Sequence, residues 1–264
     1  MGVINVTPDS FSDGGRHADS VAAVTHALRM IDEGAGLIDV GGESTRPGAP
    51  SVSVETEIER VVPVIEALAA RTKIPISIDT SKPAVMTAAV HAGASMINDV
   101  RALREPGAMQ AAARTDAAIC LMHMQGEPRT MQSDPRYSDV VAEVRDFLRE
   151  RTEACLASGI AKNRLVVDPG IGFGKRLEHN LALLAGLPAV TALGWPVLIG
   201  VSRKSMLGTL LGRAVDERVA GGVAMATAAV LAGASIVRTH DVAATVDAVK
   251  VAVALRAAGY SRGV

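Results

Sequence analysis

Polar or ionisable residues follow each of eight short apolar runs in the sequence. The set comprises Asn5, Asp39, Asp79, Asn98 with Asp99, His123, Asp168, Ser202 with Arg203 and Lys204, and Arg238 with His240. Carboxylates and amides accept hydrogen bonds from N–H groups, and Lys and Arg side chains bind anions. Any single member of the set could instead cap the next helix. Helix capping does not explain the mixture of carboxylates, amides and cations, so the set as a whole predicts one functional site.

The elements that must position these residues alternate between strand and helix. The apolar runs span residues 2–6, 37–40, 74–78, 95–97, 117–122, 165–167, 196–201 and 236–237. They recur about every 33 residues, roughly the length that a strand-plus-helix unit needs. Helical periodicity occupies residues 21–33, 54–71, 83–92, 138–158 and 242–258. Gly34, Gly93 and Gly233 stand where a helix gives way to a strand, and each is expected to end its helix in a left-handed conformation.

This alternation predicts an α/β protein with a single (β/α)8 barrel. An open doubly wound sheet also fits alternating units, but eight short strands, a length near 250 residues and the lack of a dinucleotide fingerprint favour the barrel. No polar linker or change of composition divides the chain, so one domain is expected over residues 1–264. Active sites of such barrels lie at the carboxyl ends of the strands, where the polar set falls.

Composition excludes several classes of function. A net charge of −1 and six aromatic residues in total argue against nucleic-acid binding. The uncharged stretch between Arg218 and Arg238 could pass for a membrane span, but its glycines and small residues predict a packed helix that runs into a buried strand, so no membrane role is expected. Cys120 and Cys155 lack metal-ligand spacing and predict reduced thiols, and no export leader is evident, which together predict a cytoplasmic protein.

Three loop segments and one histidine contain residue types that could take part in binding or catalysis. The loops at residues 5–15 and 41–50 are long and rich in turn formers, and Phe11 within the first suggests a lid over a ligand. The glycine-rich segment 168–175 fails the spacing of a nucleotide-binding P-loop, because only three residues separate Gly170 from Gly174. His123 matches no zinc pattern and is expected to be a buried structural histidine.

Seven segments in order give the sequence a recognisable likeness. They are NVTPDSFSDG at 5–14, GESTRPG at 42–48, SIDT at 77–80, IND at 97–99, DPGIGFGK at 168–175, SRKS at 202–205 and RTHD at 238–241. Together they resemble dihydropteroate synthase, the sulfonamide target in folate synthesis. The resemblance implies a barrel transferase that joins 6-hydroxymethyl-7,8-dihydropterin pyrophosphate to 4-aminobenzoate, with Mg²⁺ as cofactor, and releases 7,8-dihydropteroate and pyrophosphate.

The resemblance also implies roles for individual residues. Asp79, Asn98, Asp168 and Lys204 would hold the pterin ring, and Arg46, Arg238 and His240 would face the leaving pyrophosphate, with Asn5 as an oxygen ligand of Mg²⁺. Phe11, Thr45, Arg46, Pro47, Phe173 and Ser205 complete the expected substrate contacts, with Phe11 and Pro47 on the 4-aminobenzoate ring and Ser205 near its carboxylate. The expected catalytic set is Asp79, Asp168, Lys204, Arg238 and His240. Lys175 lies in a matched segment but is given no catalytic role.

The chemistry implied is an SN1-like transfer in which pyrophosphate leaves before the amine attacks. Family members usually pair, so a homodimer is expected. Two alternatives remain open at this stage. A methyltetrahydrofolate–corrinoid methyltransferase would share the barrel and the pterin pocket but has no reason to keep a pyrophosphate corner, and a catalytically silent paralogue would bind pterin without turnover.

Overall fold

Eight parallel strands form the centre of the molecule in the computed structural model, which describes residues 1–6, 15–44, 50–127 and 130–260. The strands are β1 (Gly2–Asn5), β2 (Ile38–Gly41), β3 (Ile76–Asp79), β4 (Met96–Asp99), β5 (Ala118–Met122), β6 (Leu165–Asp168), β7 (Leu198–Gly200) and β8 (Ile236–Arg238). Each coincides with one of the apolar runs expected to form a strand.

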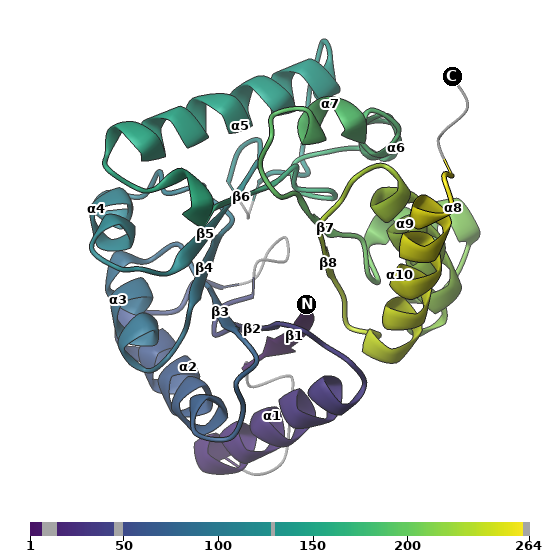
Figure 1. The fold of residues 1–264 in the computed structure, drawn as a ribbon. Helices are drawn as coiled ribbons and strands as arrows, with labels where there is room; N and C mark the ends of the chain where they lie inside the picture. The colour runs from purple at the N-terminus through teal and green to yellow at the C-terminus, as the bar shows by residue number, and fades with distance from the viewer. Residues whose placement is uncertain (7–14, 45–49, 128–129, 261–264) are drawn as a thin grey trace.

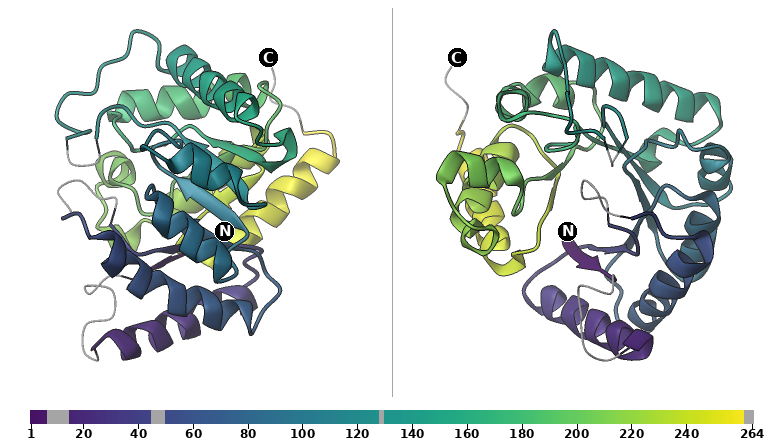
Figure 2. Two further views of the ribbon diagram at one scale, coloured as in Figure 1. Left: turned by 90° about the vertical axis from the view of Figure 1, so that its left-hand side faces the viewer. Right: turned by 180° about the vertical axis from the view of Figure 1, so that it is seen from behind.

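Helices lie around the outside of the strands (Figure 1). They are α1 (Gly15–Asp32), α2 (Val54–Ala69), α3 (Pro83–His91), α4 (Ala108–Ala113), α5 (Val140–Ala157), α6 (Leu177–Ala185), α7 (Leu187–Thr191), α8 (Ser205–Leu211), α9 (Val219–Leu231) and α10 (Val242–Ala257), with 3₁₀ turns η2 (Lys162–Arg164) and η3 (Val215–Glu217). The views from the side and from behind show the same arrangement of outer helices and inner strands (Figure 2).

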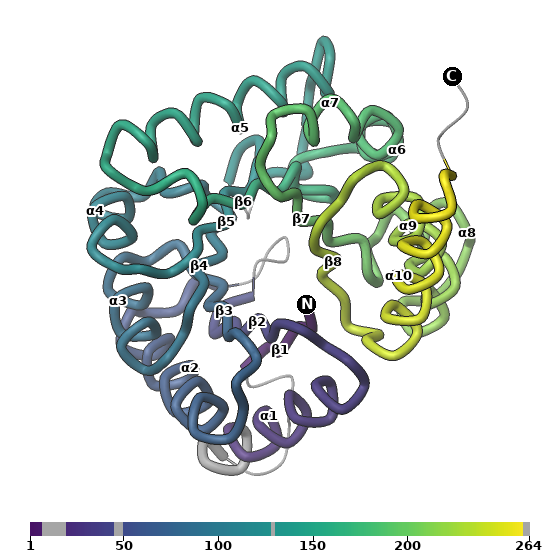
Figure 3. The backbone as a smooth tube through the Cα atoms, viewed as in Figure 1, coloured from purple at the N-terminus to yellow at the C-terminus, as the bar shows by residue number. Residues whose placement is uncertain are grey.

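The sheet closes into a barrel at two narrow seams. Strands β1 to β6 pair in sequence order, and β7 pairs with β8. Isolated bridges join the two groups, Val167 with Val197 on one side and Gly2 with Thr239 on the other. The tube representation shows β8 returning beside β1 to complete the ring (Figure 3). The predicted (β/α)8 barrel is therefore confirmed.

Glycines end three helices as expected. Gly34, Gly93 and Gly233 have φ angles of 99°, 116° and 103°, which L-residues with a side chain rarely adopt. At Gly93 the surroundings are also crowded, because a Cβ there would lie 2.7 Å from the Cβ of Ala69. These residues let each chain segment reverse directly from helix to strand.

The uncharged stretch after Arg218 forms α9 and then β8, as predicted. Ala226, Ala229 and Val230 of α9 are buried. In the described part of the chain, no helix has the length and apolar character required to cross a membrane.

Candidate active site

The period of two along a strand builds the barrel interior in layers. Met96, Cys120, Val166 and Leu198 form a buried apolar cluster, with Leu37 and Ile236 packed against it. Two residues further along their strands come Asn98, Asp168, Asp39 and Arg238, which must face the same side as the residues below them. The apolar cluster is thus the floor beneath a polar layer at the carboxyl ends of the strands.

Arg238 is the centre of that polar layer. Its Nε donates to Oδ2 of Asp39 at 2.7 Å, and its Nη2 donates to Oδ2 of Asp79 at 2.9 Å. Burial acts against the charge of Arg238, but the two carboxylates outweigh it and raise the pKa of the guanidinium. Asn98 joins the same group, since its Nδ2 donates to Oδ2 of Asp39 at 3.2 Å. One guanidinium and one amide therefore converge on a single carboxylate oxygen.

Two carboxylate oxygens in this layer have no protein donor. Oδ1 of Asp39 and Oδ1 of Asp79 are buried and make no hydrogen bond within the described residues. Burial raises the pKa of Asp79 to about 7; Arg238 opposes this shift, and the charges of Asp39, Asp99 and Glu57 add to it. Buried acceptors without donors are costly unless a ligand supplies the hydrogen bonds.

Asp168 and Lys204 form the opposite side of the polar layer. Oδ1 of Asp168 accepts from the backbone N–H of Gly170 at 2.7 Å. Burial lowers the pKa of Lys204 to about 8, although Asp168 opposes that shift. The Lys204 ammonium donates to the carbonyl of Ile171 and lies 4.5 Å from the centre of the Phe173 ring. The layer therefore offers several acceptors and one ammonium donor.

Lys175 and His123 fix the glycine-rich segment after Asp168. The Lys175 ammonium donates to the carbonyls of Gly170 at 2.9 Å and Phe173 at 3.0 Å, and it contacts Nδ1 of His123 at 2.9 Å. Burial, with help from Lys175, lowers the pKa of His123 to about 2, so the imidazole is neutral. His123 also stacks edge-on against Phe147 with ring centres 4.9 Å apart. It is the structural histidine that the sequence predicts.

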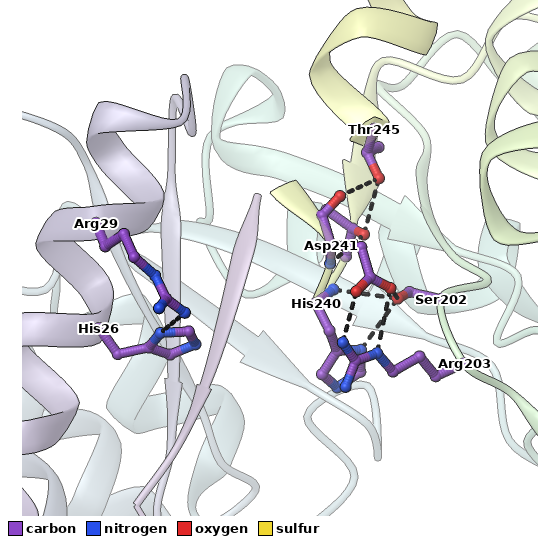
Figure 4. A network of polar contacts seen from close by, with 8 residues as sticks. His26, Arg29, Ser202, Arg203, His240, Asp241 and Thr245 are labelled. Carbon is purple, nitrogen blue, oxygen red and sulfur yellow. Dashed lines mark hydrogen bonds and ion pairs between the residues drawn. The ribbon is translucent and has the colours of Figure 1, made fainter. Parts of the chain in front are cut away.

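His240 lies at the rim, held by residues that follow β7 and β8 (Figure 4). Its backbone N–H and its Nδ1 both meet the Ser202 hydroxyl at 3.1 Å. That hydroxyl reaches Oδ2 of Asp241 at 3.4 Å, and Arg203 pairs with Oδ1 of Asp241 at 2.5 Å. Arg203 adopts a left-handed φ of 58°, which places its guanidinium back over the Asp241 carboxylate. This network fixes the backbone and ring of His240.

A cavity of about 630 Å³ adjoins His240. Asn5, His26, Arg29, Arg203 and His240 contribute to its lining. Asn5 ends β1, where its side chain is half-buried. The expected magnesium ligand and one expected pyrophosphate cation therefore border the same space.

The donor set around Asn5 fits a metal that brings its own ligands. No group of three or more His, Cys, Asp or Glu side chains capable of holding a metal occurs among the residues that the structure describes. Mg²⁺ commonly keeps several waters and binds one or two protein oxygens together with substrate phosphates. An amide oxygen at the edge of a cavity large enough to admit a substrate phosphate suits that mode and does not suit a permanent all-protein site.

The substrate contacts expected in the two long loops fall mostly outside the described residues. Phe11, Thr45, Arg46 and Pro47 lie outside the described residues. Glu43, near the start of the second loop, is described, and its Oε2 pairs with the Lys82 ammonium at 2.5 Å. Lys82 also pairs with the buried Glu57 at 2.5 Å. The base of this loop is thus fixed by an ion-pair cluster.

Ser205 is the first residue of α8 and is exposed.

Asp39 makes more contacts in the polar layer than its place in the sequence indicates. It appears among the polar strand ends, but no role follows for it until the directions of Arg238 and Asn98 are known. Asp99, the neighbour of Asn98, turns away from the polar layer and accepts from the backbone N–H groups of Arg101 and Leu103.

Comparison with known proteins agrees with this geometry. A family model described as pterin binding enzyme matches residues 1–240. The dihydropteroate synthase of Escherichia coli strain K12 is 55% identical over 251 residues, covering 95% of this chain and 89% of the relative. The corresponding synthase of Haemophilus influenzae is 50% identical over 95% of this chain and 91% of its own length.

Solved structures match the whole barrel. Yersinia pestis dihydropteroate synthase with a sulfonamide drug complex has a TM-score of 0.93 at 54% identity and covers 97% of this chain and 94% of its own. Xanthomonas albilineans dihydropteroate synthase with 4-aminobenzoic acid has a TM-score of 0.92 at 56% identity, covering 97% and 92%. The same enzyme in complex with 7,8-dihydropteroate scores 0.89 at 53% identity, covering 97% and 93%. On its sequence, its barrel and the polar layer at its centre, the chain belongs to the pterin-binding enzyme family, alongside the dihydropteroate synthases.

Proposed function

We infer that the protein is a dihydropteroate synthase, which joins 6-hydroxymethyl-7,8-dihydropterin pyrophosphate to 4-aminobenzoate and releases pyrophosphate. The observation that carries this inference is the polar layer at the centre of the barrel. There Arg238 pairs with Asp39 and Asp79, and Asn98 donates to Asp39. The buried Asp168 lies close enough to Lys204 to oppose the fall in the pKa of that ammonium. The relatives with 4-aminobenzoic acid and with 7,8-dihydropteroate support the same reaction.

The pterin ring matches the polarity of this layer. Its amino-pyrimidinone edge carries adjacent N–H donors and one carbonyl oxygen. Asp168 retains Oδ2 for donors, because only its Oδ1 accepts from the loop backbone. Asp79 presents the buried Oδ1 that has no donor among the described residues. Lys204 is the ammonium suited to the ring carbonyl.

The reaction follows from this charge pattern. The bond between the pterin methylene carbon and the pyrophosphate oxygen breaks first, and its electron pair leaves with pyrophosphate. The resulting methylene cation is delocalised over the ring nitrogens, and the carboxylates of Asp79 and Asp168 stabilise it. The neutral amine of 4-aminobenzoate then forms the new carbon–nitrogen bond and loses a proton. An arylammonium ion is a strong acid, so this step needs no dedicated base.

Cations at the rim receive the leaving group. His240 borders the cavity beside Asn5, and the loop residue Arg46 completes the proposed rim set. Arg238 is proposed to act from the polar layer below, where its Nε and Nη2 pair with Asp39 and Asp79. When bound, Mg²⁺ supplies charge stabilisation to the pyrophosphate oxygens, with Asn5 as its proposed protein ligand. The role of His240 does not depend on the metal, because Ser202 already fixes the direction of its ring.

The 4-aminobenzoate pocket is proposed to form from both long loops. Phe11, Thr45 and Pro47 would hold the ring, with Phe173 at the boundary with the pterin site and Ser205 near the carboxylate. Ser205 opens α8 directly after Lys204 and is exposed, which supports its proposed position at the solvent side of the pocket.

A second copy of the chain is proposed to cover an apolar surface on the α8–α10 side. Leu210, Leu211, Val215, Val251 and Leu255 are between 40% and 58% exposed. Helices α8 and α10 both lie against α9 (Figure 1). Exposed apolar side chains on one side of a molecule are typical of association surfaces. Val251→Arg should convert a dimer to a monomer in sedimentation velocity, and a monomeric unmodified protein would contradict this proposal.

We place the enzyme in the cytoplasm, because its two cysteines are buried, unpaired thiols. The methyltransferase and silent-paralogue alternatives gain no support from the relatives, which are named as synthases.

Release of pyrophosphate that requires both substrates tests the proposed function. The unmodified protein and Lys162→Ala, which alters an exposed lysine, should release pyrophosphate only when pterin pyrophosphate and 4-aminobenzoate are both present. Lys204→Ala should not. Release that 4-aminobenzoate does not accelerate, or none with both substrates, would refute the assignment.

A further inference from the structure

We propose that Asp39 is a positioning residue that fixes which face of the Asn98 amide the pterin meets. The proposal rests on the proposed function, since it concerns how the same pocket selects its ring. Asp39 is fully buried on β2, and Asn98 is nearly so on β4. The two residues are joined through Oδ2 of Asp39 and Nδ2 of Asn98.

The chemistry of the partner decides the orientation of the amide. Oδ2 of Asp39 already accepts from Nε of Arg238 at 2.7 Å, so it is a carboxylate oxygen acting as an acceptor. An amide turned the other way would bring its own oxygen against that carboxylate oxygen, with no hydrogen between them. The amide is therefore held with its NH₂ toward Asp39, which leaves the Asn98 oxygen for the interior space.

This orientation sets the pocket's selectivity. With Asn98 fixed, Asp79, Asn98 and Asp168 all present acceptors, and a ring must carry matching N–H donors. Without the anchor, Asn98 could rotate and offer NH₂ in place of the oxygen. A ring with one N–H replaced by an acceptor would then be tolerated. Sites built to bind a donor reject analogues that lack it, because a buried acceptor is left without a hydrogen bond.

Arg238 shares the same anchor, which explains why a carboxylate stands here. A neutral amide at position 39 could present either its oxygen or its NH₂ to Asn98, so it would no longer dictate the direction of the Asn98 amide, and Arg238 would keep only one charged partner, Asp79. Asp39→Asn keeps the size of the side chain and removes the charge. It therefore tests the anchor without opening a cavity.

The test compares ring analogues of 6-hydroxymethyl-7,8-dihydropterin in which one ring N–H at a time is replaced by an acceptor. Their dissociation constants are measured by calorimetry for the unmodified protein, Asn98→Ala, Asp39→Asn and the double variant. The informative analogue is the one whose binding penalty disappears in Asn98→Ala. We expect Asp39→Asn to reduce that same penalty about tenfold, and we expect the double variant to bind the analogue as Asn98→Ala does, with no additional effect of the change at position 39.

Asp99→Asn is the matched control. Asp99 is an equally buried carboxylate on β4 that contacts neither Asn98 nor Arg238 through any hydrogen bond described above. It should leave the penalty unchanged. An Asp39→Asn protein that keeps the full penalty, or a double variant in which the two effects simply add, would overturn the proposal. Pyrophosphate release by the unmodified protein would still stand in that case, so this failure is distinct from failure of the proposed function.

A measurement on the unmodified protein covers the possibility that Asp39→Asn does not fold. The Asn98 side-chain NH₂ resonances are assigned by their loss in Asn98→Ala. One of the two protons should exchange with water at least tenfold more slowly than the NH₂ of the exposed Asn163 in the ligand-free protein. Equal exchange rates for Asn98 and Asn163 would also overturn the proposal.

Discussion

Replacing Arg238 by Ala should destabilise the protein in a pH-dependent way. The substitution removes the guanidinium that pairs with Asp39 at 2.7 Å and Asp79 at 2.9 Å, which leaves two buried carboxylates without their cation. Loss of one partner from a buried ion pair costs about 3–5 kcal/mol of unfolding free energy. For a chain of this size that corresponds to a fall in melting temperature of roughly 6–20 °C.

The pH dependence follows from the pKa of Asp79. Burial raises this pKa to about 7 in the folded protein, from an ordinary value of 3.8. A raised folded pKa means that the folded state binds a proton the unfolded state lacks, so stability is lost as pH rises through the folded value. Between pH 8 and 6 the unmodified protein gains about 1.4 kcal/mol from this group. Without Arg238 the pKa of Asp79 rises further, and the unfolding free energy that the variant gains between pH 8 and pH 6 approaches about 2.7 kcal/mol. The difference in unfolding free energy between the variant and the unmodified protein is therefore about 1 kcal/mol smaller at pH 6 than at pH 8.

Urea unfolding followed by circular dichroism at pH 6 and pH 8 measures this change. Arg151→Ala is the control, because Arg151 donates only to the carbonyls of Ala102 and Leu103. The loss of unfolding free energy in Arg151→Ala should be the same at both pH values. A pH-independent deficit for Arg238→Ala, or stability equal to that of the unmodified protein, would refute the account of the buried carboxylates.

Three further outcomes are expected. Lys204→Ala and Asp168→Ala should abolish condensation while circular dichroism stays unchanged, and turnover near the normal rate would exclude their assigned roles. The kcat/KM for pterin pyrophosphate should fall as pH drops below about 7, because protonated Asp79 can no longer accept at both oxygens; a profile unchanged in Asp79→Asn would contradict this. Ser202→Ala should lower kcat/KM about tenfold, the equivalent of one hydrogen bond, by releasing the ring of His240, whereas Ser202→Thr should restore most of it, and equal losses for both variants would argue against positioning.

Much of the architecture follows from local sequence. The eight strands are short apolar runs whose spacing leaves room for one helix each, and Gly34, Gly93 and Gly233 mark the reversals. The start of α1 at Gly15 is missed by six residues, because apolar periodicity begins only at Val21. The paired helices α6 and α7 leave no separate signal either, since Leu187 and Pro188 continue the chain almost directly after Gly186.

Candidate site residues can be proposed from the sequence, but the hydrogen bonds that connect them cannot. Asp79, Asn98, Asp168 and Lys204 stand out because each follows an apolar run. The link from Arg238 to Asp39 spans 199 residues, and nothing local to either residue indicates that the guanidinium turns inward. The hydrogen bonds of Lys175 are similarly invisible, because they depend on the folded path of the loop around it. The expected contacts at Phe11, Thr45, Arg46 and Pro47 stay predictions.

The two seams of the barrel divide the polar layer by charge. Asp39, Asp79 and Asp168 belong to the group of strands from β1 to β6, whereas Arg238 lies on β8 and Lys204 directly follows β7. A pterin ring bound by residues of both groups would connect β1–β6 to β7–β8 across the seams, where one isolated β-bridge joins the strands on each side. The bound ring then contributes to the closure of the barrel. Because only pyrophosphate leaves and the pterin ring passes intact into the product, that contribution lasts until the product dissociates.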